Sequence, residues 1–374
     1  MKKVKELIIL YPSFERGGAT VNLVNFINIC AKKNIKIYLI TNINKKDKKK
    51  FVKKNIKFFI LDNKFKHKIF NRLVTSIKSI FLLLNLFKKI NNRNSLVVSF
   101  QSHILPIIFS KLFRRKVVIR NSEDVVDATK YADYKLSAFF VFLLKFFFYN
   151  LSDGVITNSL KAKKSLDRII FKNKTKLIYN PYLTKVLNQK RNIRENLILS
   201  VGRLCKQKNQ VVAIKAFAIF VKKFSNYKLI LIGHGYDHIK LKKLCLSLSI
   251  SENVIFKGWV SNPSKYYLKS KILIFPSLYE GLPNTLIEAV NYNLPCISTR
   301  CSGATDILTE EYGSYIPMNN HQLLAKKMID SILNYKKKLS DNKKIKKRLF
   351  RFLIKPQVSK YINYCNNILN LSSN

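Results

Sequence analysis

The sequence contains few acidic residues. Only 20 Asp and Glu accompany 70 Lys and Arg, so the formal net charge of the 374-residue chain is +50. Residues 1–185 hold 39 basic and 10 acidic residues, a net charge of +29. This excess indicates either an anionic partner, nucleic acid or an acidic membrane surface, or codon bias, because Lys, Asn, Ile, Phe and Tyr all have AT-rich codons. Arg is scarce beside Lys, 13 to 57, although planar phosphate recognition favours Arg.

Paired cysteines, long apolar runs and a cleavable leader are also lacking. The six cysteines show no C-x-x-C or metal-ligand spacing, which favours a reduced, cytosolic chain. No uncharged run reaches the roughly 18 residues that a membrane span requires. The start, MKKVKELIILYP, has a short apolar run and no small-residue cleavage site, so it predicts a first strand and not a signal peptide.

The chain does contain enough apolar residues, 47%, and enough length for two globular domains. Short apolar runs alternate with helical patterns, which predicts parallel sheets with helices on both faces. The expected strands are Lys5–Leu10, Ile35–Thr41, Ile56–Leu61, Leu96–Phe100, Val117–Arg120 and Val155–Asn158, then Leu197–Val201, Lys228–Ile232, Val254–Phe256, Ile272–Phe275 and Pro295–Ser298.

Residues 184–195 interrupt this alternation, because they are polar and lack periodicity. We therefore predict an N-terminal Rossmann-like domain over residues 1–183 and a C-terminal one over residues 184–355. Residues 356–374 are expected to form a helix that packs back on the N-terminal domain. Two such α/β domains facing across a cleft would place the carboxyl ends of their strands beside a ligand.

The strongest motif is Glu280-Gly-Leu-Pro-Asn-Thr-Leu-Ile-Glu288, in which two carboxylates bracket a loop and a helix start. Asn284 is a plausible N-cap, so the backbone amides of Gly281–Thr285 would form an anion site suited to a pyrophosphate. Either carboxylate alone could simply be a surface acid or complement the helix dipole. In a chain with so few acids, the pair favours a binding site.

A second motif, Gly202-Arg203-Leu-Cys-Lys-Gln-Lys208-Asn209, joins a predicted strand to a helix. Gly202 permits a tight turn. Arg203 and Lys208 would lie at the strand end and helix start, where two fixed cations stabilise a departing diphosphate. In so basic a chain, two cations near one loop can also arise by chance.

Together these motifs resemble the retaining glycosyltransferases of family 4, which have the GT-B fold. The resemblance extends over residues 5–335. It includes Gly17-Gly18, Ser152–Ser159, Tyr179–Pro181 and the Phe256–Trp259 segment. It implies a bacterial-type enzyme of surface glycan, lipopolysaccharide or lipid-linked oligosaccharide assembly.

The resemblance also implies roles for single residues. Arg203 and Lys208 would hold the donor diphosphate, Glu280 the donor sugar and Glu288 the ribose. His103 would face the sugar, and Gly17 and Gly18 would approach both diphosphate and acceptor. The remaining donor contacts would come from Gly258, Trp259, Val260, Gly281, Leu282, Pro283, Asn284 and Thr285. For a lone histidine such as His103, a structural role is the alternative.

The family's reaction retains anomeric configuration and needs no metal, which fits the absence of an Asp-x-Asp motif. The expected partners are a UDP- or GDP-linked sugar and a glycan or lipid-linked acceptor, with no cofactor. One departure is Gly233-His234-Gly235, where the family usually has an acid between the glycines. The third glycine of a dinucleotide fingerprint is also missing, and His234 receives no role.

Two stretches suggest contact with a membrane. In Lys68–Lys89, basic residues flank an apolar stripe, as in helices that lie in a membrane interface; Leu82, Leu83, Leu86 and Phe87 are the residues expected to insert. Leu136–Leu151 is similarly rich in Phe, Leu and Val. Either helix could instead pack on the sheet. The expectation is a cytoplasmic protein, peripheral on the inner face of the plasma membrane.

Two alternatives remain open. The basic runs at residues 45–50 and 343–348 could bind nucleic acid, although no zinc-finger, RRM or related signature accompanies them. A GT-B protein without catalysis could act as a scaffold, although Arg203, Lys208, Glu280 and Glu288 are all present. We expect an enzyme that does not bind nucleic acid.

Overall fold

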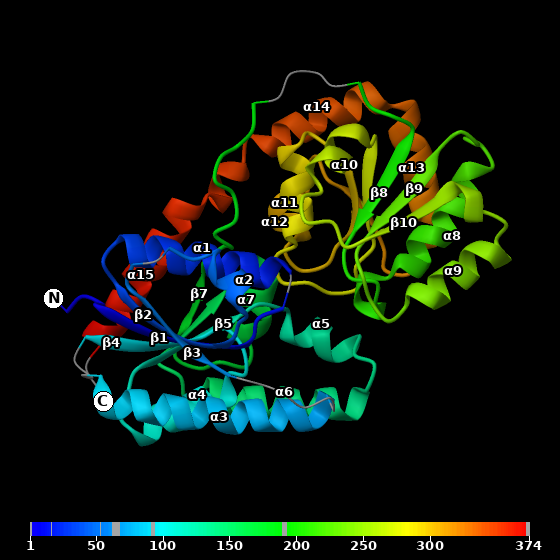
Figure 1. The fold of residues 1–374 in the computed structure, drawn as a ribbon. Coiled ribbons are helices and arrows are strands. Elements are labelled where there is room, and N and C mark those ends of the chain that lie inside the picture. Colours follow the sequence, from blue (N-terminus) through cyan, green and yellow to red (C-terminus); the bar gives the residue numbers. More distant parts are fainter. Residues whose placement is uncertain are drawn as a thin grey trace. The chain divides into compact units, whose positions relative to one another are not determined.

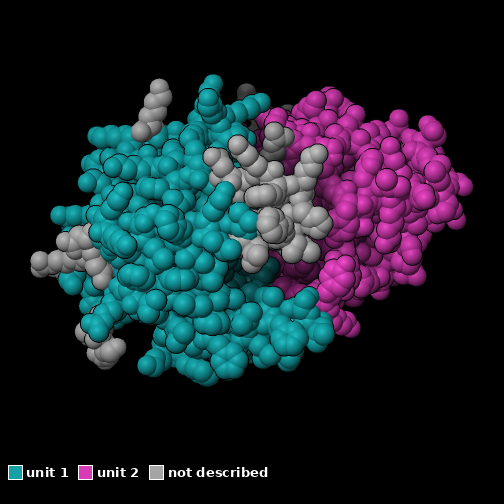
Figure 2. Space-filling model, turned by 60° about the horizontal axis from the view of Figure 1, so that its bottom comes forward, with its two compact units in different colours: residues 1–125, 136–184, 352–374 teal, residues 126–135, 185–351 magenta. Residues whose placement is uncertain are grey.

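The computed structural model describes residues 2–15, 17–52, 54–61, 68–90, 94–188 and 193–371. They form two compact units, each built around a parallel sheet (Figures 1 and 2). Unit 1 comprises residues 1–125, 136–184 and 352–374, and unit 2 comprises residues 126–135 and 185–351. Compared with the predicted domains, the boundary falls after residue 184, residues 126–135 group with unit 2, and residues 352–355 group with unit 1.

The sheet of unit 1 has seven strands. Most of their residues are buried on both faces, as expected of parallel strands covered by two helical layers. In spatial order the strands are β3 (Ile56–Ile60), β2 (Lys36–Asn42), β1 (Glu6–Ser13), β4 (Ser95–Ser99), β5 (Val117–Asn121), β6 (Gly154–Thr157) and β7 (Thr175–Leu177). The sequence did not predict β7, which has only three residues.

Helices cover both faces of this sheet. One face packs against α1 and α15, and the other packs against α3, α4 and α6 (Figure 1). The helices of the first half and the C-terminus are α1 (Gly18–Lys32), α2 (Lys45–Lys48), α3 (Lys68–Lys89), α4 (Ile104–Leu112), α5 (Val125–Lys130), α6 (Lys135–Tyr149), α7 (Leu160–Asp167) and α15 (Ile354–Asn370).

The C-terminal helix α15 is part of the core of unit 1. Tyr361 packs against Phe26 of α1 with ring centroids 5.2 Å apart. Asn366 accepts a hydrogen bond of 2.8 Å from the backbone N–H of Val4, just before β1. The last helix therefore completes the layer that α1 begins.

Unit 2 repeats this architecture with a six-stranded sheet. In spatial order its strands are β10 (Val254–Gly258), β9 (Lys228–Ile232), β8 (Leu197–Val201), β11 (Ile272–Phe275), β12 (Cys296–Thr299) and β13 (Ser314–Ile316). The α-helices are α8 (Gln210–Val221), α9 (His238–Ser247) and α13 (His321–Leu333) on one face, and α10 (Ser264–Lys269), α11 (Asn284–Asn291), α12 (Ala304–Leu308) and α14 (Tyr335–Lys346) on the other. Three short 3-10 helices are η1 (Lys206–Lys208), η2 (Ser251–Asn253) and η3 (Leu349–Phe352).

Candidate active site

The Arg203–Lys208 motif lies at the carboxyl end of β8, in the predicted strand–loop–helix arrangement. The chain turns at Gly202, forms η1 and enters α8 through Asn209, whose φ is 55°. Arg203 is exposed, and its Nη2 donates a 3.0 Å hydrogen bond to Oε1 of Gln207. The loop therefore presents one guanidinium at the edge of the sheet of unit 2.

Lys208 joins this loop to the Glu280 motif. Its Nζ donates to Oε1 of Glu280, 72 positions away in the sequence, and lies 5.2 Å from the centroid of the Phe275 ring. Only 9% of Glu280 is exposed. Gln207 reinforces the connection, because its Nε2 donates a 2.9 Å hydrogen bond to the backbone oxygen of Tyr279. The structure thus brings the two strongest motifs together at the carboxyl edge of one sheet.

Glu288 lies on α11, in the turn that follows the loop. The helix begins at Asn284, and Pro283 is its N-cap, so the prediction that Asn284 caps the helix is wrong by one residue. Tyr267 of α10 donates a 2.5 Å hydrogen bond to Oε2 of Glu288, and its ring stacks on Tyr292. Tyr267 carries no motif, and its role becomes visible only where α10 packs beside α11.

Three glycines allow the loops of unit 2 to pack against one another. A Cβ at Gly233 would lie 1.9 Å from the backbone oxygen of Gly202, and one at Gly235 would lie 1.9 Å from that of Leu204. Gly303 has φ +77°, and a Cβ there would lie 2.2 Å from the oxygen of Gly281. The Gly-His-Gly segment and Gly303 therefore fix the two motif loops in place, a role that the sequence did not reveal.

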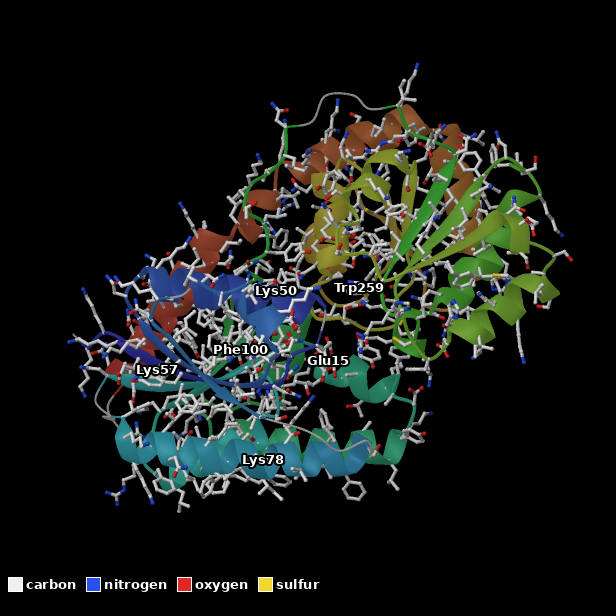
Figure 3. All side chains as sticks on the ribbon, viewed as in Figure 1. Glu15, Lys50, Lys57, Lys78, Phe100 and Trp259 are labelled. Carbon is white, nitrogen blue, oxygen red and sulfur yellow. The ribbon has the colours of Figure 1, made fainter. Side chains whose placement is uncertain are left out.

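The Gly258–Val260 segment begins at the last residue of β10, an edge strand of the same sheet. Gly258 has φ +63°, and a Cβ there would approach Cε1 of His234 to 3.0 Å. Trp259 is exposed (Figure 3). The segment therefore offers an accessible aromatic side chain on a backbone turn that favours glycine.

Three predicted site residues, Gly17, Gly18 and His103, belong to unit 1. Gly17 is the N-cap of α1, Gly18 is the first residue of that helix, and a Cβ at Gly17 would meet no heavy atom within 4 Å. Packing therefore does not require a glycine at position 17. The other predicted site residues, in the Arg203–Lys208 and Glu280–Glu288 motifs, belong to unit 2.

His103 lies between β4 and α4 and has a defined tautomer. Oγ of Ser99 donates to the backbone oxygen of Gln101 at 2.8 Å, so it can only accept from Nδ1 of His103, 3.0 Å away. Burial, reinforced by the cations Lys145 and Arg120, lowers the pKa of His103 to about 3. The neutral ring therefore keeps the lone pair of Nε2 available as a hydrogen-bond acceptor.

The depressed pKa predicts an acid-dependent loss of stability. Between about pH 6.5 and pH 3 the unfolded chain binds a proton at His103 that the folded chain does not, so the free energy of unfolding falls as the pH falls. The limit is about 1.4 kcal/mol per pH unit. In urea titrations, His103→Asn is expected to have a shallower slope than wild type over this range. Equal slopes in wild type and His103→Asn would contradict the assignment.

Among the residues that the structure describes, no group of three or more His, Cys, Asp or Glu side chains could hold a metal ion. Within the same ranges, no helix has both the length and the apolar character to cross a membrane.

The comparison with known proteins points to one kind of domain. Residues 185–348 match the family model described as "Glycosyl transferases group 1". An uncharacterized glycosyltransferase of Methanocaldococcus jannaschii, MJ1059, is 38% identical over a 179-residue match that covers 44% of each chain. A Campylobacter jejuni protein, named as an α-1,4-N-acetyl-D-galactosaminyltransferase acting on a diphospho-undecaprenol-linked saccharide, is 30% identical over 197 residues, 50% of this chain and 54% of that one.

The fold has close counterparts among solved structures. Anabaena Alr3699/HepE in complex with UDP-glucose superposes with a TM-score of 0.77 over 96% of this chain and 98% of that one, at 17% identity. The chain spans about half the length of the curated relatives it matches. These matches favour a glycosyltransferase over a nucleic-acid-binding protein. The prediction of a GT-B, α/β fold with two Rossmann-like domains is confirmed, and residues 185–348 are similar to the group 1 glycosyl transferases.

Proposed function

We propose that this protein is a retaining glycosyltransferase of the family 4 type. It transfers a hexose or N-acetylhexosamine from a UDP- or GDP-linked donor to a glycan or lipid-linked acceptor in surface polysaccharide or oligosaccharide synthesis. The observation that carries the proposal is that the Arg203–Lys208 loop and the Glu280 loop are hydrogen-bonded to each other at the carboxyl edge of the sheet, with Glu288 on the helix that follows. The group 1 domain match over these residues supports it.

The chemistry follows from this arrangement. Transfer breaks the bond between the anomeric carbon and the diphosphate oxygen and forms a bond to the acceptor oxygen, whose proton leaves with the nucleoside diphosphate. Negative charge grows on the diphosphate as the first bond breaks, and Arg203 and Lys208 stabilise it. The backbone N–H groups of Gly281, Leu282, Asn284 and Thr285, around the start of α11, bind phosphate and sugar, and the Gly258–Val260 segment lies against the base. No residue is assigned to a metal.

The acceptor side is assigned to unit 1. Gly17 and Gly18 leave room for the backbone of α1 to approach the substrate, and Nε2 of His103 accepts a hydrogen bond from a sugar hydroxyl. The name of the Campylobacter jejuni relative, which includes undecaprenol, supports a lipid-linked acceptor, and the UDP-glucose complex of HepE supports a UDP-linked donor. Such an acceptor fits a cytoplasmic protein that is peripheral on the inner face of the membrane.

The division of roles between the two carboxylates gives a direct test. UDP or GDP should raise the melting temperature, because a ligand bound only by the native state stabilises it. Glu288→Gln should weaken nucleotide affinity by about tenfold, because it removes a charged partner of the ribose hydroxyls. Glu280→Gln should leave nucleotide affinity nearly unchanged and slow transfer, because Glu280 contacts the sugar. Calorimetry with the nucleotide alone and hydrolysis across a panel of nucleotide sugars measure the two effects.

Tyr267→Phe is the matched variant for Glu288, because it removes the hydroxyl that donates to this carboxylate and keeps the carboxylate itself. It should weaken nucleotide binding less than Glu288→Gln does. Equal losses of nucleotide affinity in Glu280→Gln and Glu288→Gln would reject the division of roles. The absence of any response to UDP, GDP and their sugars would reject the enzyme itself.

A further inference from the structure

The helical layer of α3, α4 and α6 carries an exposed apolar stripe. On α6 and just beyond it, Leu136, Phe140, Leu144, Phe147 and Leu151 are all exposed, with 72% of Leu136, 57% of Phe140 and 63% of Phe147 accessible. These positions recur every three or four residues, so they share one face of the helix. Figure 2 brings this side of unit 1 forward.

The opposite face of α6 is apolar as well. Phe142, Phe146 and Phe148 pack against the core, and Tyr149 is buried in it. A surface helix of a soluble protein usually turns polar residues outward, whereas a helix that is apolar all round needs a second apolar environment. The outer stripe of α6 is therefore not explained by the packing of unit 1.

Exposed apolar side chains also occur on the other two helices of the layer. On α3, Ile77 and Phe81 are exposed, one helical turn apart, and on α4 the terminal Leu112 is exposed. Phe113 links these helices, because its ring lies 5.7 Å from that of Phe87. An apolar surface spread over several elements marks an interaction site with a protein or a membrane.

The charge of the layer selects between these partners. By sequence, α3, α4 and α6 together contain eight Lys and Arg residues and no Asp or Glu. The basic residues include exposed Lys78 (Figure 3), Lys88 and Lys89. Exposed leucine and phenylalanine on helices that also carry exposed lysine match the interface of an anionic bilayer, where apolar side chains enter the acyl region and cations meet lipid phosphates.

We propose that this layer docks on an anionic membrane surface and that the outer stripe of α6, with Ile77 and Phe81 of α3, is the inserted part. This inference rests on the proposed function, since a lipid-linked acceptor would lie in the same surface. It replaces the insertion predicted from the sequence. Leu83, Leu86 and Phe87 are buried in the core of unit 1, and Leu82 packs partly against it, so these side chains face the sheet.

The experiment is co-sedimentation of the full chain with vesicles of phosphatidylglycerol and phosphatidylethanolamine, and with vesicles of phosphatidylcholine alone. Wild type is expected to bind the anionic vesicles at about 0.1 M salt and to remain partly bound at about 1 M, where charge is screened. Phe140→Ser/Phe147→Ser should lower the partition coefficient at least tenfold, because losing one inserted apolar side chain costs roughly tenfold. Ile239→Ser/Leu246→Ser on α9 removes similarly exposed residues from unit 2 and should bind as wild type does.

Several results would overturn the proposal. Wild type could fail to bind anionic vesicles, or the two double variants could bind equally well. Without lipid, gel filtration could show a wild-type dimer that Phe140→Ser/Phe147→Ser dissociates, which would make the stripe a contact between copies. Hydrolysis of nucleotide sugars without vesicles separates this inference from the proposed function. If hydrolysis persists while vesicle binding fails, only the membrane face is wrong. Melting temperatures verify that the variants fold.

Discussion

Alanine at Arg203 or at Lys208 is expected to slow sugar transfer by about a hundredfold. Each substitution removes a fixed cation from the site assigned to the leaving diphosphate, and losing one such group typically costs about 3 kcal/mol of transition-state stabilisation. Initial rates with a saturating nucleotide sugar measure the effect. Lys206→Ala is the matched control, because Lys206 lies in the same short helix but pairs with Asp133; it should change the rate less than about threefold.

The Arg203 and Lys208 substitutions are expected to affect the stability of the protein differently. Arg203 is exposed, so its loss should leave the free energy of unfolding nearly unchanged. Lys208 is largely buried against Glu280, and removing it leaves a carboxylate without its partner, at a cost of about 3 kcal/mol.

A double variant, Lys208→Ala/Glu280→Gln, distinguishes the two effects. It should recover much of the lost stability, because the buried charge is gone, and it should remain inactive. Wild-type turnover in Arg203→Ala/Lys208→Ala, measured on folded protein, would refute the assignment of both cations.

The second large effect, on stability, is expected at Arg120. Among the residues that the structure describes, Arg120 is the largest fully buried side chain. Its Nε donates to the hydroxyl of Tyr361 at 2.9 Å and its Nη2 to Oδ1 of Asn180 at 2.5 Å, and it also donates to Ser122. The guanidinium lies 5.4 Å from the ring centroid of Phe100. Arg120 therefore connects β5 to α15 and to the segment after β7.

Arg120→Met is expected to lower the free energy of unfolding of unit 1 by at least about 3 kcal/mol, because several buried acceptors lose a charged donor. Tyr361→Phe, which removes one of these bonds, should cost about 1 kcal/mol. Exposed Arg348→Met should change stability by less than about 0.5 kcal/mol. Urea unfolding measures all three, and a smaller loss for Arg120→Met than for Tyr361→Phe would contradict this role.

Most of the longer strands were predicted, because a buried parallel strand appears in the sequence as a short, continuous run of apolar residues. The ranges predicted for β8, β9 and β11 agree with the structure residue for residue. β7 and β13, each three residues long, were missed. Runs of that length have no periodicity of their own, and their pairing with longer neighbours decides their conformation.

The candidate site was predictable where chemistry is concentrated in a short motif. Arg203, Lys208, Glu280 and Glu288 were found in this way, and the ion pair between Lys208 and Glu280 was not, because it joins separate loops. Tyr267 was missed for the same reason. The hydroxyl of Tyr267 contacts Glu288 only because two helices pack together, so no recognisable residue spacing in the sequence announces it.

The amphipathic helices show most clearly what the tertiary structure decided. Residue spacing established that Lys68–Lys89 is helical and that Leu136–Leu151 is rich in apolar residues, and composition established the positive charge around them. Burial of one stripe and exposure of the other could not be deduced, because apolar residues look alike whether they face a sheet or a lipid. The packing of α3 and α6 on the sheet of unit 1 assigned Leu83 and Phe87 to the core and left Phe140 and Phe147 outside. By itself, therefore, the sequence determined the two α/β sheets and the chemical groups at their edges, which depend on local pattern, whereas the contacts between loops and the outward faces of helices depend on segments that meet only after folding.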